Sequence, residues 1–151
     1  MIALLQRVTE ASVHVNGREV GAIGTGILAL VGVEKRDTEA QAERLLERIL
    51  AYRMFDDGQG RMNLDLRDVD GELLLVSQFT LAADTDKGHR ASFSSAAAPE
   101  HGQRLFDLLV QGARAALGRC ETGVFGAHMQ VKLVNDGPVT FRLRVPPPVQ
   151  S

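Results

Sequence analysis

The chain has 151 residues, enough for one domain that buries a sizeable core. Hydrophobic residues make up 44% and charged residues 24%, which excludes a fibrous or a disordered class. The 17 basic and 19 acidic residues give a formal net charge of −2, which argues against a protein that holds a long nucleic-acid backbone.

Cys120 is the only cysteine, so the chain has no internal disulfide and no cysteine-cluster metal site. We expect it to be a structural thiol. The N-terminal stretch turns polar too soon for a signal peptide, and no apolar run approaches the roughly 18 residues that cross a bilayer. We therefore expect a cytoplasmic protein without a membrane segment.

A hairpin and a central strand are predicted first. Val13 and Val15 alternate with polar residues and precede Asn16-Gly17, a dipeptide that favours a type I′ turn, so residues 12–23 predict a hairpin. The run ILALVGV, residues 27–33, is apolar at nearly every position, as in a strand covered on both faces. The Gly-rich stretch before it, residues 21–26, leads into a strand and not a helix, so we expect a turn there and no phosphate loop.

Two helices are predicted. Thr38 and Gln41 are spaced as a capping box, and apolar residues follow at helical spacing to about Arg53. The second helix begins at Pro99, which suits the first helical position, and Gly118 is a plausible stop.

Between the helices lie turns, an apolar strand and a long loop. Residues 56–60 (DDGQG) and 68–71 (DVDG) have turn chemistry, and the second turn leads into the strand ELLLVSQF. The following 17 residues, 82–98, contain one large apolar side chain, Phe93. Loops of that length in a compact domain are usually functional or disordered.

The C-terminal segment predicts an antiparallel strand pair. MQVKLV and RLRV alternate apolar and polar residues on either side of NDGPVTF, residues 135–141, which we expect to be the hairpin turn. The fold class is α/β with α+β character: a single three-layer domain, residues 1–145, of mainly antiparallel or mixed sheets with two helices. The proline-rich residues 146–151 are expected to form a flexible tail.

Most familiar catalytic patterns are missing. The four histidines fall in different elements with no pair at i, i+4, which argues against a metal site, and there is no GxSxG elbow. SQFTL, residues 77–81, remains, because strand ends that open long loops commonly display catalytic groups. A strand edge and a plain turn are the structural alternatives for SQFTL and for Gly137-Pro138. The residues alone thus indicate a small enzyme or a binding domain.

Together, SQFTL and NDGPVTF resemble the two signature motifs of the D-aminoacyl-tRNA deacylases. The opening MIALLQRVTEASV, the run GILALVGVEK, the segment SQFTLAADTDKG followed by RASFS, and FGAHMQVKLVNDGPVTF are also similar to that family in order and spacing. The resemblance covers most of the chain and implies the fold of that family.

The resemblance also implies a homodimer, without metal or cofactor, that hydrolyses the ester between a D-amino acid and the 3′-terminal adenosine of tRNA. It implies activity on glycine mischarged onto tRNA as well. By resemblance, a cis Gly137-Pro138 peptide reaches into the partner's site and is held by Arg7, and Met129 helps bind substrate. The catalytic pocket then consists of four residues, Ser77, Gln78, Phe79 and Thr80.

Chiral proofreading is physically reasonable for such a site. Mirror-image amino acids differ by no methylene, so a pocket that merely fits a side chain cannot separate them. Gly137 has no Cβ, so its backbone can approach a ligand closely. We expect the Gly137 and Pro138 carbonyls to accept from the substrate ammonium and to leave no room for an L side chain.

Two routes of hydrolysis remain open. Thr80 could be a nucleophile, although no histidine or lysine is evidently placed to activate it. Alternatively, backbone amides around Gln78 to Thr80 could form an oxyanion hole, assisted by the ribose 2′-hydroxyl of the substrate, and we favour this route. The rival interpretations are a Thr80-dependent covalent esterase and a non-catalytic dimeric module that binds RNA ends.

The chain departs from the family pattern at two positions. Ala91 stands where proline is common, and His128, expected on a strand surface, stands where an acidic residue is frequent. Lys87, His89 and Arg90 could meet phosphates near the acceptor end or could simply be solvated.

Overall fold

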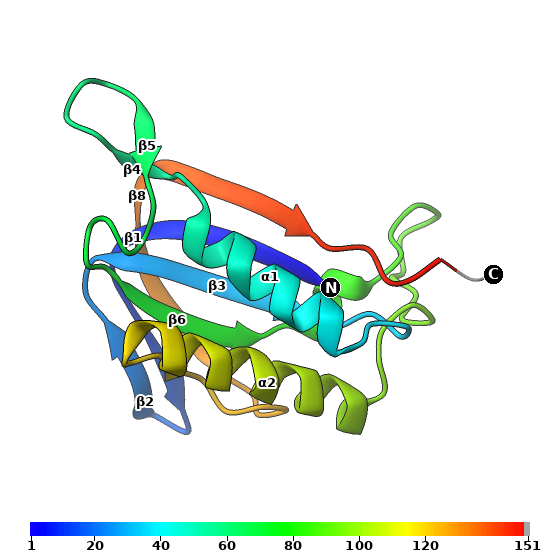
Figure 1. Ribbon diagram of the computed structural model, residues 1–151. Helices are drawn as coiled ribbons and strands as arrows, with labels where there is room; N and C mark the ends of the chain where they lie inside the picture. Colours follow the sequence, from blue (N-terminus) through cyan, green and yellow to red (C-terminus); the bar gives the residue numbers. More distant parts are fainter. Residues whose placement is uncertain (150–151) are drawn as a thin grey trace.

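A curved six-stranded sheet with two helices on one face forms the body of the protein (Figure 1). The computed structural model describes residues 1–149. The strand order is β2-β1-β3-β6-β7, and β8 pairs with the other edge of β1. The sheet strands are β1 (Ile2–Val15), β2 (Arg18–Ile23), β3 (Gly26–Gly32), β6 (Glu72–Ser77), β7 (Glu121–Thr122) and β8 (Gln130–Arg144).

The remaining elements cover the sheet or project from it. Helices α1 (Glu39–Ala51) and α2 (Pro99–Leu117) pack on one face, and the 3₁₀ turn η1 (Phe79–Ala82) follows β6. The short hairpin of β4 (Phe55–Asp56) and β5 (Met62–Leu64) stands away from the body at the upper left of Figure 1.

Alternate residues of the central strands face two separate cores. In β3, Ile27 and Ala29 pack against the helices, whereas Leu28 lies in a second core on the opposite face of the sheet. The second core is closed by the curvature of the sheet itself: a Cβ on Gly21 in β2 would lie 2.5 Å from the Thr122 carbonyl oxygen in β7. Helices, central strands and the curled outer strands thus form three layers, and the predicted fold class is confirmed.

Several predicted elements are confirmed. Asn16 and Gly17 have φ of 50° and 78°, as a type I′ turn requires. At the start of α1 the Gln41 side chain accepts the Thr38 N–H at 2.8 Å, and α2 begins at Pro99 and is capped by Gly118 in the left-handed conformation. The strand β3 lies between β1 and β6 and is central, as its unbroken apolar run predicted.

Three predictions were wrong in detail. Helix α1 ends at Ala51 and not near Arg53. Residues 21–23 of the Gly-rich stretch belong to β2, and only the residues that follow turn. The largest correction concerns NDGPVTF, which is not a hairpin turn: both flanking segments belong to one strand, β8, and both pair with β1.

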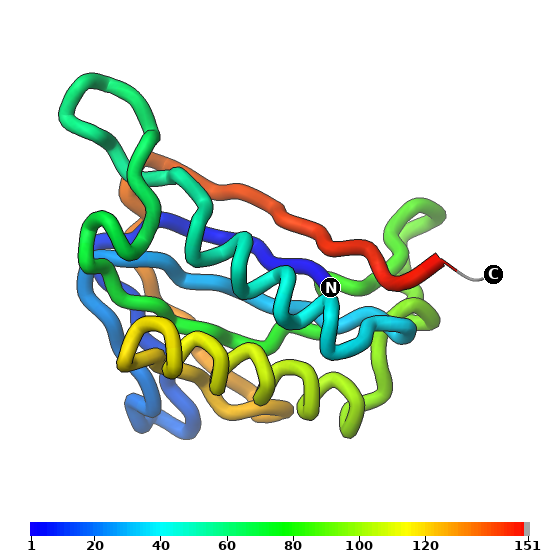
Figure 2. Tube along the Cα trace, viewed as in Figure 1, coloured from blue at the N-terminus to red at the C-terminus, as the bar shows by residue number. Residues whose placement is uncertain are grey.

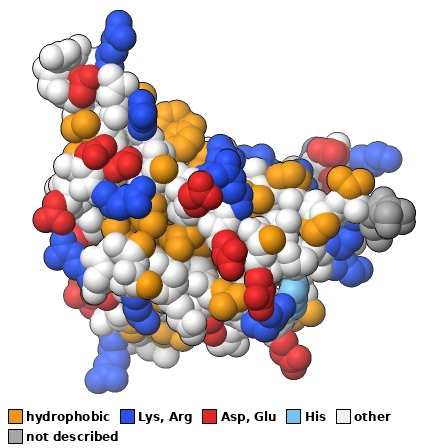
Figure 3. Space-filling view, in the orientation of Figure 1, with side chains coloured by type: hydrophobic (Ala, Val, Ile, Leu, Met, Phe, Trp, Pro, Cys, Tyr) orange, Lys and Arg blue, Asp and Glu red, His pale blue; other side chains and the backbone are white. Residues whose placement is uncertain are grey.

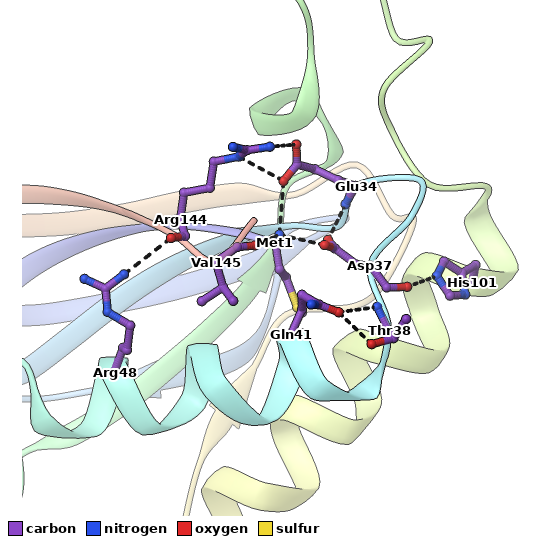
Figure 4. Close-up of polar contacts among 9 residues, drawn as sticks. All are labelled: Met1, Glu34, Asp37, Thr38, Gln41, Arg48, His101, Arg144 and Val145. Carbon is purple, nitrogen blue, oxygen red and sulfur yellow. Dashed lines mark hydrogen bonds and ion pairs between the residues drawn. The ribbon is translucent and has the colours of Figure 1, made fainter. Parts of the chain in front are cut away.

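A partly buried ionic cluster joins the start of β1 to the end of β8 (Figure 4). The Met1 ammonium donates to Asp37 at 2.9 Å, to Glu34 at 3.1 Å and to the Val145 carbonyl at 2.6 Å. Arg144 donates to both carboxylate oxygens of Glu34. Although burial alone raises the pKa of Glu34, the hydrogen bonds from Arg144 and the ammonium outweigh it and hold this pKa below its usual value.

The end of β8 lies beside the start of β1, and the chain beyond β8 extends away from the N-terminus (Figure 2). The Val145 N–H donates to the Met1 carbonyl at 2.9 Å, so the chain beyond β8 starts beside β1. Residues 145–149 form neither helix nor strand; the rest of the predicted tail, residues 150–151, lies outside the described residues. No helix in the described part of the chain is long and apolar enough to cross a membrane.

Candidate active site

SQFTL lies where β6 ends and the chain turns into η1. Ser77 pairs with Val31 of β3, and the Gln78 N–H donates to the Val31 carbonyl at 2.7 Å. The turn can pack this tightly because position 32 is glycine: a Cβ there would lie 2.9 Å from Cβ of Leu81 and 3.0 Å from the Gln78 carbonyl oxygen. Gly32 therefore lets η1 sit directly on the end of β3.

Two backbone amides at the start of η1 are free. The first N–H groups of a 3₁₀ turn have no acceptor within it, and those of Phe79 and Thr80 have no hydrogen-bond partner among residues 1–149. The Gln78 amide, in contrast, is engaged by Val31. Of the predicted oxyanion donors, the structure leaves Phe79 and Thr80 available.

The Thr80 hydroxyl has one polar neighbour, the Gln78 side-chain amide, which donates to it. No histidine, lysine or carboxylate hydrogen-bonds to this hydroxyl in the part of the chain that the structure describes. A side-chain amide cannot remove a proton from a hydroxyl. The arrangement thus supplies no base to activate Thr80 as a nucleophile.

The Phe79 ring is 62% exposed and contacts the ring of Phe93, with 5.2 Å between the centroids. Met129, which the resemblance assigns to substrate binding, is half-buried and packs against the second core. A Cβ on Gly123 would lie 2.6 Å from the Met129 sulfur, so Met129 fills space beside the loop after β7.

Gly137 and Pro138 lie in a bulge of β8. Gln6 pairs with Thr140 and Val8 pairs with Asn135, so four residues of β8, 136–139, stand opposite Arg7 alone. The Gly137–Pro138 peptide bond is cis, as the resemblance implied. Gly137 has φ of 149°, and a Cβ there would lie 2.6 Å from the Val139 nitrogen, so only glycine fits this position.

The bulge is held at its base by Asn135. The Asn135 side chain donates to the carbonyls of Arg7 and Val139, both at 2.9 Å, and accepts the Val139 N–H at 3.1 Å. One side chain therefore satisfies three backbone groups that the broken strand ladder leaves free.

Arg7 braces the bulge from the other side. Its Nε donates to the Asp136 carbonyl at 2.9 Å and its Nη1 donates to the Met54 carbonyl, also at 2.9 Å. These bonds tie the bulge to the chain at the base of the β4–β5 hairpin. Arg7 and the Gly-Pro segment, which the resemblance linked, are thus brought together.

The bulge and SQFTL of one chain lie at opposite ends of the sheet. Val8 pairs with Gly26 at the start of β3, whereas Ser77 pairs with Val31 near its end. Five residues of strand separate the two levels, or about 16 Å at about 3.3 Å per residue. The strand order places β1 and β3 between β8 and β6 as well. Gly137 and Pro138 therefore do not meet the four SQFTL residues of their own chain.

The remaining candidate residues are on the surface. Ala91 is exposed in the long loop, and His128 is exposed just before β8 and not on a strand. Lys87, His89 and Arg90 are exposed and form no ion pair in the described part of the chain. Within residues 1–149 no group of three or more His, Cys, Asp or Glu side chains is placed to hold a metal ion.

Sequence reasoning missed two residues. Asn135 was interpreted as part of a turn, although an asparagine two residues before Gly137 could have been recognised as a side chain that bonds local backbone. Phe93 was noted only as the one large apolar residue of its loop, and nothing in the sequence indicated its contact with Phe79.

The chain is similar to known proteins over almost its whole length. A family model described as D-Tyr-tRNA(Tyr) deacylase matches residues 4–144. A protein of Thioalkalivibrio sulfidiphilus (strain HL-EbGR7), named D-aminoacyl-tRNA deacylase, is 68% identical over 148 residues, which cover 98% of this chain and 99% of the relative.

Two solved structures share the fold. A c-Myc DNA Unwinding Element Binding Protein has a TM-score of 0.92 and 38% identity, covering 97% of this chain and 99% of its own. A probable eukaryotic D-amino acid tRNA deacylase has a TM-score of 0.80 and covers 94% of this chain and 98% of its own. Its identity of 18% shows similarity of fold alone.

Proposed function

This chain belongs to the D-Tyr-tRNA(Tyr) deacylase family, and we propose that it hydrolyses the ester bond of D-aminoacyl-tRNA in the cytoplasm, releasing free D-amino acid and tRNA. The observation that carries the proposal is the full-length likeness to a relative named for this activity. The direct test is release of D-tyrosine from D-tyrosyl-tRNA, compared with the same incubation without protein. No release above that background would contradict the proposal.

The active site is built from two copies of the chain. Gly137-Pro138 and SQFTL lie too far apart to act together in one subunit, as their registers on β1 and β3 require. Among the described residues β8 pairs only with β1, so its outer edge is free, and the bulge interrupts that edge. Unpaired edges readily take up another chain.

A twofold axis would complete both sites at once. From the bulge, β8 runs back along β1 until Arg144 pairs with Ile2, at the end of the sheet where η1 lies. An axis near the middle of that segment exchanges the bulge end of one subunit with the η1 end of the other. Each bulge would then reach the partner's SQFTL pocket.

The free amides of Phe79 and Thr80 form the oxyanion hole. An ester carbonyl placed against both donors would gain negative charge as water attacks, and one well-aimed donor is worth about 10²–10³ in rate. The ribose 2′-hydroxyl next to the ester assists the water. The chain supplies position and charge stabilisation, and the substrate supplies the proton relay.

The partner's bulge selects the handedness of the amino acid. The carbonyls of Gly137 and Pro138 accept from the substrate ammonium, and their backbone occupies the space that an L side chain would need. A D-amino acid turns its side chain away, and glycine has none, so both are hydrolysed. The support for this role is the exposed bulge, braced by Arg7 and Asn135.

A covalent route through Thr80 is the alternative mechanism. It requires a base that the Thr80 hydroxyl lacks in the described chain. Thr80→Ala separates the two routes: loss of all turnover would establish the covalent route, whereas hydrolysis that persists within about tenfold fits the oxyanion route, since the Thr80 N–H remains.

A purely binding role is the second candidate, favoured by the name of the DNA unwinding element binding protein that shares the fold. The charge distribution disfavours it. The chain has net charge −2, and Figure 3 shows acidic and basic side chains interspersed over the visible face rather than gathered in a basic stripe.

A further inference from the structure

Two aromatic rings form a small exposed platform beside the free amides. Phe79 is 62% exposed and Phe93 is 45% exposed, and their centroids lie 5.2 Å apart at an interplanar angle of 50°. The other exposed large hydrophobic side chains among residues 1–149 are Val20, Met62, Val124, Val134 and Val149, and none of them is aromatic.

The loop that carries Phe93 is fastened on both sides of that residue. Asp84 and Ser92 exchange two backbone hydrogen bonds, at 2.8 and 2.9 Å, and the Lys35 N–H donates to the Ser95 carbonyl at 2.9 Å. The second ring is therefore held in place before any ligand arrives. A preorganised surface binds at lower entropic cost than a mobile one.

The same loop carries exposed cations beside two exposed carboxylates, Asp84 and Asp86. Three exposed basic residues lie between Asp84 and Ser92, namely Lys87, His89 and Arg90. Neither Lys87 nor Arg90 forms an ion pair with a carboxylate in the described chain. Proteins that bind single-stranded nucleic acid combine such cations, which follow the phosphates, with aromatic faces on which bases stack.

We propose that the Phe79–Phe93 platform stacks against the base of the penultimate nucleotide of the tRNA 3′ end. This inference rests on the proposed function, in which the terminal adenosine carries the ester to the amides of Phe79 and Thr80. The nucleotide before it must then leave the site across the neighbouring surface, where the Phe93 ring lies 5.2 Å from the Phe79 ring between centroids.

A double-mutant cycle tests the contact. The cycle combines Phe93→Leu, which keeps an apolar side chain but removes the aromatic face, with D-tyrosyl-tRNA whose penultimate nucleotide lacks its base. We expect each change alone to lower kcat/KM roughly tenfold, the scale of one base–aromatic stack. Together they should lower it by about the same factor as either alone.

Phe93→Tyr is the matched control, because it keeps the aromatic face and should keep the dependence on the penultimate base. The inference would be overturned if the two decreases in kcat/KM multiplied when both changes are combined, or if Phe93→Leu alone caused no decrease. The inference would also be overturned if the Phe93→Leu variant dissociated toward monomer in sedimentation equilibrium, because the two rings would then form a contact between subunits. Absence of D-tyrosine release by the wild type is a separate result and contradicts the deacylase function itself.

Discussion

The side-chain amide of Asn135 grips Val139 at both of its backbone polar groups, donating to the carbonyl at 2.9 Å and accepting the N–H at 3.1 Å. This pair closes the bulge that carries Gly137 and Pro138. An aspartate has the same shape but no protons to donate, and its charge would repel the carbonyls of Arg7 and Val139. The geometry of the proposed chiral selector thus depends on one amide.

Asn135→Asp should therefore lower kcat/KM for D-tyrosyl-tRNA about tenfold or more and reduce the preference for D over L. The ratio of D to L rates is the informative readout, because simple destabilisation would not change it. Asn16→Asp, the same change in an exposed turn far from the bulge, should behave like the wild type. An unchanged ratio in Asn135→Asp would show that Asn135 does not position the bulge.

The Gly137 position should tolerate no side chain. A Cβ there would lie 2.6 Å from both the nitrogen and Cγ2 of Val139, so Gly137→Ala must displace the bulge. Since a displacement of about 1 Å can cost about 10²-fold in rate, we expect at least that loss in kcat/KM. Gly58→Ala is the control, since Gly58 also has positive φ but open space at Cβ. Full activity in Gly137→Ala would contradict a role for the bulge.

A single substitution can remove the backbone N–H of Phe79. Phe79 is the first residue of η1, where proline fits best, and Gln78 before it is already outside the helical region. Phe79→Pro lacks the N–H, whereas Phe79→Ala keeps it and loses the same ring. We expect kcat of the proline variant to be about 10²-fold below that of the alanine variant. Equal kcat values would exclude this amide from the oxyanion hole.

Acid should weaken the fold through Glu34. The pKa of Glu34 lies below its ordinary value of 4.5, so the unfolded chain binds a proton first as the pH falls, and stability is lost as the pH drops below about 4.5. Glu34→Gln should cost about 2 kcal/mol at neutral pH and flatten that acid-side decline. Urea unfolding at pH 7 and pH 4 measures both effects. Glu47→Gln, in an exposed ion pair, should cost under about 0.5 kcal/mol.

Local patterns predicted the local structure well. The turn at Asn16-Gly17, the start of α1 near Thr38 and the span of α2 each depend on residues that are neighbours in the sequence. The strand β3 was recognisable because burial on both faces leaves an unbroken apolar run.

Pairing between distant segments could not be predicted in the same way. Alternation on both sides of NDGPVTF is the same whether the two segments pair with each other or both pair with β1, and only the tertiary contact decides. For the same reason the sequence could not show that Gly137 and SQFTL of one chain lie at opposite ends of the sheet. The amides of Phe79 and Thr80 are likewise free because the chain forms η1 there, and no side-chain pattern predicted this 3₁₀ turn.

The proposal that two subunits share each site predicts complementation. Subunits with Gly137→Ala retain an intact SQFTL pocket, and subunits with Phe79→Pro retain an intact bulge. After unfolding and refolding together, mixed dimers should contain one intact site and regain up to about half the activity per mixed dimer. Activity no higher than the sum of the two parents would place the whole site within one chain.

The most direct test of the central claim is the ratio of kcat/KM for D-tyrosyl-tRNA to that for L-tyrosyl-tRNA, measured with the wild type under single-turnover conditions. Rejection of the L form by the bulge predicts rapid release of D-tyrosine, release of glycine from glycyl-tRNA, and L-tyrosyl-tRNA that survives as long as it does without protein. Equal rates for the D and L substrates would contradict the account, because a site that hydrolyses both cannot be selecting handedness through Gly137 and Pro138.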